Sequence, residues 1–255
     1  MTRRWYDAAS TFRKSSMIKA IVTGHSRGLG AGIAAALVAR GATVLGVSRG
    51  GNAAQANIEQ VALDLADANA VAQWLESGAL ARFLAGATQA ILVNNAGVVT
   101  PVGPPGRQGA AALAQAVAIN VTAALTLSDA FVAATNGCAD RRIAHISSGA
   151  GRNAYAGWSV YCATKAALDM HAQAVALDAV PNLRIASVAP GVIDTGMQAH
   201  IRGTDAADFP ALQRFIELDQ AGGLAAPEAT GQQLADYLLG THFGVEQVTD
   251  VRMFG

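Results

Sequence analysis

Thr23-Gly24-His25-Ser26-Arg27-Gly28-Leu29-Gly30 is the stretch from which the fold of this chain can be inferred. It follows a short apolar run at 19–23 and opens an alanine-rich run at 29–40 that has the composition of a helix. Glycines at such a junction allow a phosphate group to approach the backbone, and the helix N-terminus favours its negative charge. No Gly-Lys-Ser or Gly-Lys-Thr follows, so the loop is not a P-loop. The pattern indicates a strand, a phosphate-binding loop and a helix, in that order.

The rest of the chain repeats this alternation of strand and helix. Predicted strands lie at 19–23, 43–47, 61–63, 90–94, 142–147, 183–189 and 247–251, and predicted helices at 29–40, 68–84, 109–135, 158–180 and 227–239. Most strand runs are continuously apolar, which is typical of parallel strands covered by helices on both faces. This order predicts a single α/β domain with a doubly wound parallel sheet flanked by helices.

Two segments depart from the alternating pattern. Residues 1–16 are mixed and partly basic, and they lack the apolar run of a signal peptide. We interpret them as an N-terminal extension to a domain over 17–255. Residues 194–224 combine several glycines with Met197, Phe209 and Phe215. They predict either a mobile lid over a ligand or an ordinary loop with one amphipathic helix.

Composition excludes several functional classes. Of the 255 residues 14% are charged, and 18 basic side chains balance 18 acidic ones, which argues against a nucleic-acid or membrane-surface partner. Polar residues interrupt the uncharged stretch at 108–128, so no membrane span is predicted. Cys138 and Cys162 are too few for a disulfide framework and favour the reducing cytoplasm. The five histidines show no ligand spacing, so no metal site is predicted.

The second predicted strand indicates which dinucleotide the glycine loop would bind. An NAD site places an Asp or Glu about 20 residues past the glycines, where it binds the ribose 2′-hydroxyl. No acidic residue occurs between Ala31 and Ile58, whereas Arg49 follows Ser48 at the strand end and Arg27 lies in the loop. Guanidinium groups bind phosphate bidentately, so the pair predicts NADP(H). The alternative is two surface arginines without a ligand.

Two further strand ends carry residues suited to a dinucleotide. Asp64 could accept a hydrogen bond from the adenine amino group, although an isolated Asp there is as typical of a turn. Asn94-Asn95-Ala96-Gly97 ends the next strand and presents small residues where a cofactor would lie against the backbone. In isolation those four residues would be an ordinary turn.

The residues that point to chemistry are Tyr161, Lys165, Ser148 and Asn120. Tyr161 and Lys165 are four apart near a helix start and therefore share one face. A phenol has a pKa near ~10, and a neighbouring ammonium should lower that pKa toward the range useful for acid/base catalysis. Ser148 ends a strand where it could bind a substrate oxygen, and Asn120 lies within a helix, where Asn is intrinsically poor. The alternatives are a surface Tyr packed on a Lys stem, a loop serine and a solvent-facing or helix-bending Asn.

These elements together resemble the Rossmann-type short-chain dehydrogenase/reductase family over nearly everything after Met17. The matching residues are 23–30, Asp64, 94–97, Asn120, Ser148, Tyr161 with Lys165, and 190–195. The resemblance implies that Tyr161 is the acid/base, that Ser148 orients the substrate, and that Lys165 binds the nicotinamide ribose. It further implies that Asn120 holds a water linked to Lys165. The expected cofactor-binding residues are Gly24, Ser26, Arg27, Gly28, Leu29, Gly30, Arg49, Asp64, Asn94, Ala96, Gly97, Tyr161, Lys165, Pro190, Gly191, Ile193 and Thr195.

A narrower resemblance rests on residues 157–170 and 194–198. They are similar to sepiapterin reductases and to bacterial relatives that reduce vicinal diketones such as benzil. The resemblance places a pterin-anchoring carboxylate near Asp250, whereas the alternative is a surface acid paired with Arg252 on the same strand face. Tyr155 and Trp158 could line the pocket or simply cap the loop before the helix. The chain lacks a glycine-rich C-terminal ending, which argues against the family's usual tetramer contact. A homo-oligomer, dimer or tetramer, is expected, and a dimer through the helices of Asn120 and Tyr161 is favoured.

The sequence therefore predicts an NADPH-dependent carbonyl reductase that acts on a small-molecule ketone, either a diketone or a pterin side chain. Two alternatives remain. One is a 3-oxoacyl-thioester reductase, which would need a basic patch to bind an acidic carrier. The other is a non-catalytic NADP-sensing protein, which would not need Tyr161, Lys165 or Ser148.

Overall fold

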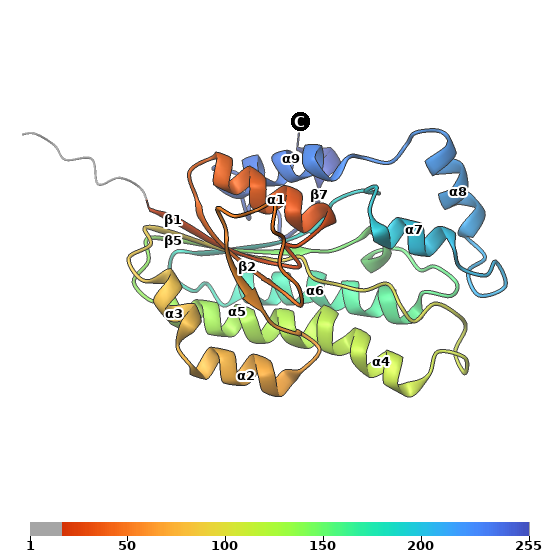
Figure 1. The fold of residues 1–255 in the computed structure, drawn as a ribbon, viewed down its shortest axis with the longest axis horizontal. Helices are drawn as coiled ribbons and strands as arrows, with labels where there is room; N and C mark the ends of the chain where they lie inside the picture. Colours follow the sequence, from red (N-terminus) through yellow and green to blue (C-terminus); the bar gives the residue numbers. More distant parts are fainter. Residues whose placement is uncertain (1–16, 255) are drawn as a thin grey trace, which may run out of the picture.

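The structure is a computed structural model that describes residues 17–254 (Figure 1). The predicted extension, residues 1–16, lies outside the described residues. Seven strands form one parallel sheet in the order β3-β2-β1-β4-β5-β6-β7. They are β1 Ile18–Thr23, β2 Thr43–Ser48, β3 Glu59–Ala62, β4 Gln89–Asn94, β5 Asp140–Ile146, β6 Leu183–Ala189 and β7 Val248–Asp250. The predicted fold class is confirmed. The third strand begins two residues earlier than predicted, and β7 is shorter than the predicted 247–251.

Helices cover both faces of the sheet. Figure 1 shows α1 (Gly28–Ala39) and α9 (Pro227–Leu239) on one face, with α5 (Ala123–Ala134) and α6 (Ser159–Leu177) on the other. The first pair touches through glycines. A Cβ on Gly32 would lie 2.4 Å from the Pro227 carbonyl oxygen, and one on Gly231 would lie 2.4 Å from the Gly32 carbonyl carbon. Only glycine at these positions permits such a close approach of two helix backbones.

Two predicted helices are interrupted. The predicted helix at 68–84 is α2 (Ala68–Glu76) followed by α3 (Ala79–Leu84), because Gly78 between them adopts a left-handed conformation with φ 72°. The predicted helix at 109–135 is α4 (Ala110–Val117), a π-helical turn η1 (Ala118–Thr122) and α5. The π turn contains Asn120, and such turns are frequent at functional sites.

The run Ala110–Ala134 is long and apolar enough, by length and composition alone, to cross a membrane. In this fold it lies along the sheet, and Leu127 and Phe131 are fully buried against the strands. A core-facing helix of a globular domain passes the same composition test.

The segment 194–224 contains two helices, one more than the loop interpretation expected. They are α7 (Gly196–Arg202) and α8 (Leu212–Gln220). Ile201, Phe209 and Phe215 are buried in a small hydrophobic cluster with Trp158, outside the two clusters that cover the sheet. Apolar packing therefore attaches this segment to the start of α6. Whether it opens as a lid stays a prediction.

Candidate active site

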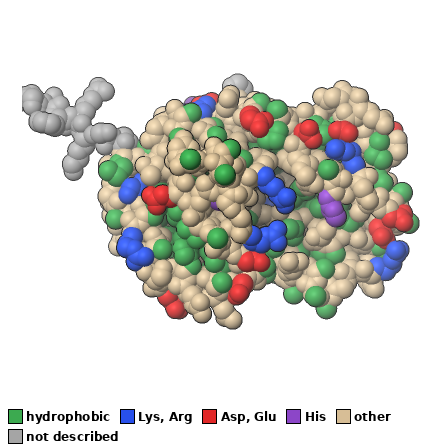
Figure 2. All heavy atoms as spheres, in the orientation of Figure 1, with side chains coloured by type: hydrophobic (Ala, Val, Ile, Leu, Met, Phe, Trp, Pro, Cys, Tyr) green, Lys and Arg blue, Asp and Glu red, His purple; other side chains and the backbone are tan. Residues whose placement is uncertain are grey.

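The carboxyl ends of the strands line a cleft of about 1320 Å³. It lies where the strand order reverses, between β1 and β4, which is where ligands bind in open α/β sheets. Figure 2 shows basic side chains gathered near the middle of one face of the molecule, while acidic and basic side chains are interspersed over the rest of it. The mixed surface agrees with the neutral charge balance.

The glycine loop is tied to the end of β4. Thr23 Oγ1 accepts hydrogen bonds from the backbone N–H of Asn95 at 2.9 Å and of Ala96 at 3.0 Å. Asn95 Nδ2 in turn donates to the Thr23 carbonyl at 2.9 Å. A Cβ on Gly30 would lie 2.2 Å from the Gly24 carbonyl oxygen, so no larger residue fits there. The loop is thereby held open as a cradle at the N-terminus of α1, and this geometry fits a dinucleotide pyrophosphate.

The two adjacent asparagines of the 94–97 motif have different environments, one buried and one lining the cleft. Asn94 is buried beneath the cleft, where its Nδ2 donates to Ser128 Oγ at 3.1 Å and lies 3.2 Å from His145 Nδ1. Asn95, which the sequence analysis left out of the site, lines the cleft instead. Successive strand residues point to opposite faces, so the two side chains separate at the strand end.

One edge of the cleft, formed by the glycine loop and the end of β2, is basic. Arg27, Ser48 and Arg49 all line the cleft, and both guanidinium groups are exposed. Within residues 17–254, neither arginine forms an ion pair with a carboxylate. Asp64 also lines the cleft, and its Oδ1 accepts the Ala66 N–H at 3.0 Å. The predicted turn at Asp64 is therefore present, and among residues 17–254 the other carboxylate oxygen of Asp64 has no hydrogen-bond partner.

The remaining predicted cofactor residues follow the other strand ends. Thr195 is the N-cap residue of α7, and its side chain would lie 3.1 Å from a Cβ placed on Gly28. The end of β6 and the glycine loop thus meet across the cleft. The other predicted members that line this cleft are Gly24, Ser26, Gly28, Leu29, Gly30, Ala96, Gly97, Pro190, Gly191 and Ile193.

Tyr161 and Lys165 lie on the first turns of α6 and are both buried. The Lys165 Nζ is 5.7 Å from the centroid of the Tyr161 ring and donates to the Ile146 carbonyl at 2.7 Å. Asn120 connects α6 to the end of β4. Its Oδ1 accepts the Val98 N–H at 2.8 Å, and its Nδ2 donates to Thr164 Oγ1 at 3.1 Å. Ser148, Tyr161 and Lys165 line one end of the cleft, whereas Asn120 does not line it and is buried beside them, bonded to Thr164.

Burial controls the ionisation of the central pair. It raises the pKa of Tyr161 to about 12, while a hydrogen bond with Ser148 acts in the opposite direction. Burial also lowers the pKa of Lys165 to about 8, with the Asp169 carboxylate opposing the change. We expected the Lys165 ammonium to lower the phenol pKa, but desolvation of the buried ring dominates and raises it, and the opposing effect comes from Ser148. Tyr161 is consequently a protonated acid at neutral pH, and this is the form that can donate a proton.

The far wall of the cleft is aromatic. Trp158 stacks on Phe209 with ring centroids 4.4 Å apart and meets the Tyr161 ring edge-on at 5.3 Å. Tyr155 lies against Trp158 at 5.4 Å, and Phe215 closes the other side. Trp158 and Tyr155 thus line the cleft, and they do more than cap the loop before α6.

Asp250 and Arg252 also line the cleft. Asp250 accepts two hydrogen bonds from the Arg252 guanidinium, from Nε and Nη2, each at 2.7 Å. We expected the two on one strand face, but Arg252 lies in a 3₁₀ turn, Val251–Met253, that follows β7. Among the described residues there is no group of three or more His, Cys, Asp or Glu side chains that could hold a metal.

Comparison with known proteins agrees with this geometry. Residues 19–206 match the family model described as short chain dehydrogenase. The chain belongs to the short-chain dehydrogenase family. Members of the family use NAD(P) as cofactor and act on CH–OH and C=O groups. The expectation from the motifs is confirmed at that level.

Two relatives of this short-chain dehydrogenase carry the names suggested by its motifs. It is 36% identical to a benzil reductase ((S)-benzoin forming) of Bacillus cereus, over 86% of this chain and 92% of that protein. It is 32% identical to a sepiapterin reductase of Rattus norvegicus, over 58% of this chain and 57% of that protein. A solved short-chain dehydrogenase/reductase from Burkholderia vietnamiensis is 46% identical, with a TM-score of 0.68 and coverage of 94% and 99%.

Proposed function

We propose that this short-chain dehydrogenase is an NADPH-dependent carbonyl reductase that converts a ketone to an alcohol. The single observation that carries the proposal is the convergence of Tyr161, Ser148 and Lys165 at the aromatic end of a cleft. The other end of that cleft has a glycine cradle and two arginines without acidic partners among the described residues. A non-catalytic sensing protein would need only the cradle.

The cofactor is proposed as NADP(H). Arg27 and Arg49 would hold the 2′-phosphate, because unpaired guanidinium groups bind phosphate through parallel N–H bonds. The cradle at Gly24, Gly28 and Gly30 would hold the pyrophosphate. When bound, the dinucleotide supplies the hydride.

The chain's own residues then handle the proton and the orientation of the substrate. Tyr161 is protonated because burial holds its pKa at about 12, so it can donate a proton to the ketone oxygen. Ser148 would hold that oxygen within reach of the phenol. Lys165 places a positive charge beside the ring as the phenol loses its proton.

The aromatic wall favours a flat apolar substrate. Trp158, Tyr155 and Phe215 line the cleft, and Trp158 contacts the Tyr161 ring, which suits an aromatic diketone. Both oxygens of Asp250 already accept from Arg252, and this disfavours Asp250 as an anchor for a pterin. The charge-balanced surface likewise gives no support to an acidic carrier for an oxoacyl thioester.

Consumption of NADPH by the purified protein tests this function. The substrates compared are benzil, a pterin with a side-chain ketone, and a 3-oxoacyl thioester, each assayed with NADPH and with NADH. The proposal expects turnover with NADPH, fastest on benzil. Tight NADPH binding without turnover of any of the three would instead support the sensing function.

Assembly and location complete the proposal. We propose that the protein forms a homo-oligomer in the cytoplasm. Met170 on α6 is 63% exposed and Leu177 is 86% exposed, and both are apolar side chains that a second copy would cover. Cys138 and Cys162 are free thiols, as suits a reducing compartment.

A further inference from the structure

Asp169 is a buried carboxylate one helical turn after Lys165 on α6, outside the residues predicted for the site. Its side chain is 8% exposed. Asp169 Oδ1 accepts a hydrogen bond from Ser187 Oγ on β6 at 2.6 Å, and its Oδ2 lies 3.3 Å from Arg152 Nε. A carboxylate is costly to bury, so it is retained only where its partners stabilise the charge.

Through its contact with Arg152, Asp169 is connected to the turn that follows Ser148. Arg152 caps the short 3₁₀ helix η2 (Gly149–Gly151), and its Nη2 donates to the Thr249 carbonyl of β7 at 2.8 Å. This turn lies directly on α6. A Cβ on Gly151 would be 2.9 Å from Asp169 Oδ2 and 3.0 Å from the Lys165 carbonyl carbon. Asp169 therefore connects the turn carrying Ser148 to the helix carrying Tyr161 and Lys165.

The surroundings of Lys165 explain why a charged residue is needed there. The ammonium donates to the Ile146 carbonyl, and a Cβ placed on Gly97 would lie 3.5 Å from its Nζ and 3.3 Å from the neutral Asn120 Oδ1. Three ionisable groups lie around it apart from Asp169: Tyr161 on its own helix, His145 on β5, and Arg152 beyond the carboxylate. None of the three supplies a negative charge at neutral pH, because the Tyr161 pKa is raised and the His145 pKa is lowered by burial.

We propose that Asp169 is a positioning residue of the reductase, which keeps the buried Lys165 ammonium protonated and, through Arg152, holds the Ser148 turn against α6. The inference rests on the function proposed above, since that function makes the charge of Lys165 matter. It is supported by the direction of the electrostatics. Burial lowers the Lys165 pKa to about 8, and Asp169 is the group that raises it. Without that carboxylate, part of the lysine would lose its proton near neutral pH.

The first test needs neither cofactor nor activity. The chain has three lysines, Lys14, Lys19 and Lys165, so an NMR spectrum of protein labelled at the lysine ¹³Cε contains few signals. In the wild-type protein the Lys165 signal should titrate near pH 8. In Asp169→Asn it should titrate at lower pH. Ser187→Ala is the matched control, because it removes the hydrogen bond at 2.6 Å and leaves the charge, and its Lys165 signal should titrate as in the wild type.

The second test is the pH profile of the reduction. Asp169→Asn should reduce kcat/KM by at least about threefold more near pH 8 than near pH 6, because a lower Lys165 pKa leaves a smaller protonated fraction at the higher pH. A loss common to both pH values reports the weakened contact with Arg152. An equal loss at every pH would mean that Asp169 serves only the structure. An unchanged Lys165 titration in Asp169→Asn would overturn the inference even if the enzyme reduces ketones. A shifted titration in a protein that reduces no ketone would refute the proposed function alone.

Thermal unfolding shows whether the Asp169→Asn protein is folded. If Asp169→Asn does not fold, Arg152→Met tests the same electrostatic effect by removing the positive partner of Asp169. The Arg152 side chain is 32% exposed, and its removal leaves Asp169 charged. Lys165 would then lie near a less compensated carboxylate and should titrate at higher pH than in the wild type. An unchanged or lower value would contradict the proposal.

Discussion

At the residue scale, burial and hydrogen bonding have opposite effects on the pKa of Tyr161. The ring is 8% exposed, and burial raises the phenol pKa to about 12. A phenol with such a pKa stays protonated over the physiological range, so the resting residue is in the form that can donate a proton to a ketone oxygen.

Replacing Tyr161 by Phe removes the proton donor and retains the ring that packs on Trp158. We expect kcat for ketone reduction to fall by about 100-fold to 10,000-fold, as is typical for loss of a general acid. NADPH binding, measured by fluorescence titration, should change little. Tyr155→Phe alters a neighbouring ring of the same cleft and should keep most of the activity. Normal turnover in Tyr161→Phe would remove the residue from the proposed role.

The prediction about the preference for NADPH over NADH concerns Arg49. Arg49→Asp replaces a phosphate-binding guanidinium by a carboxylate that repels the 2′-phosphate and can accept from a ribose hydroxyl. The NADPH/NADH ratio of kcat/KM should fall by about tenfold to a hundredfold. Arg82→Asp makes the same charge change on α3, away from the cleft, and should leave the ratio unchanged. Equal effects of the two substitutions would contradict the phosphate assignment.

The burial of His145 predicts that the protein becomes less stable as the pH is lowered. It is fully buried on β5 with its Nε2 2.9 Å from His171 Nδ1, and burial, reinforced by the charges of His171 and Lys165, lowers its pKa to about 3. Between pH 6.5 and about 3 the unfolded chain binds a proton that the folded protein does not. The free energy of unfolding should therefore fall as the pH is lowered through this window. Urea unfolding across the window should show a weaker fall for His145→Gln and the wild-type fall for exposed His242→Gln.

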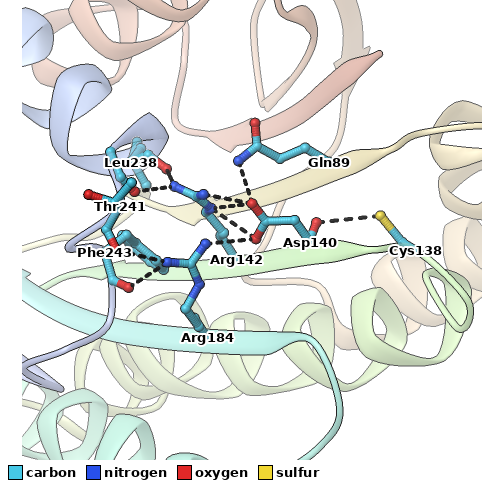
Figure 3. Close-up of polar contacts among 9 residues, drawn as sticks. Gln89, Cys138, Asp140, Arg142, Arg184, Leu238, Thr241 and Phe243 are labelled. Carbon is cyan, nitrogen blue, oxygen red and sulfur yellow. Dashed lines mark hydrogen bonds and ion pairs between the residues drawn. The ribbon is translucent and has the colours of Figure 1, made fainter. Parts of the chain in front are cut away.

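At the scale of elements, a polar cluster at the amino end of the sheet joins three strands to one helix (Figure 3). Arg142 on β5 donates from Nη1 to the Leu238 and Gly240 carbonyls at 2.6 and 2.7 Å, which satisfies the C-terminus of α9. Asp140 accepts from Arg142, from Arg184 on β6 and from Gln89 on β4. The cluster therefore fixes α9 against the sheet at the end opposite the cleft.

Asp140→Ala should destabilise the protein because it leaves the Arg142 guanidinium, 6% exposed, without its carboxylate. We expect the free energy of unfolding to fall by about 2–4 kcal/mol. The control is Asp236→Asn, which breaks an ion pair whose carboxylate is 68% exposed, and it should cost much less. Denaturant unfolding measures both, and equal losses would show that burial does not control the strength of the cluster.

At the scale of the whole molecule, the face formed by α4, α5 and α6 carries apolar side chains that no described element covers. Val117, Met170 and Leu177 are exposed there, and only a third of the most apolar window in Ala110–Ala134 is buried. Apolar surface of this kind is typical of an interface between subunits. The assembly would then support the two helices that hold Asn120, Tyr161 and Lys165.

Met170→Glu combined with Leu177→Glu should dissociate the oligomer, since both side chains lie on one face of α6 seven residues apart. Light scattering coupled to size exclusion measures the mass. Val245→Glu alters a residue that is 64% exposed outside that face and should leave the mass unchanged. A wild-type protein that is monomeric would contradict the prediction directly.

The amino-acid sequence alone predicted the parallel sheet, which is confirmed, and it identified the glycine loop and the four residues proposed for catalysis. Those features depend on local periodicity and on the chemistry of single side chains, both of which can be read along the chain. Breaks in helices were harder to predict, because Gly78 and the π turn at Asn120 interrupt runs whose composition is uniformly helical.

Only the tertiary structure decided which neighbouring asparagine faces the cleft, that burial raises the Tyr161 pKa, and that Asp169 is buried against Ser187 and Arg152. Each depends on desolvation and on partners distant in sequence: Ser187 is 18 residues from Asp169, and Thr249 is 97 residues from Arg152. Charge and burial are properties of the assembled neighbourhood, so no local pattern could contain them.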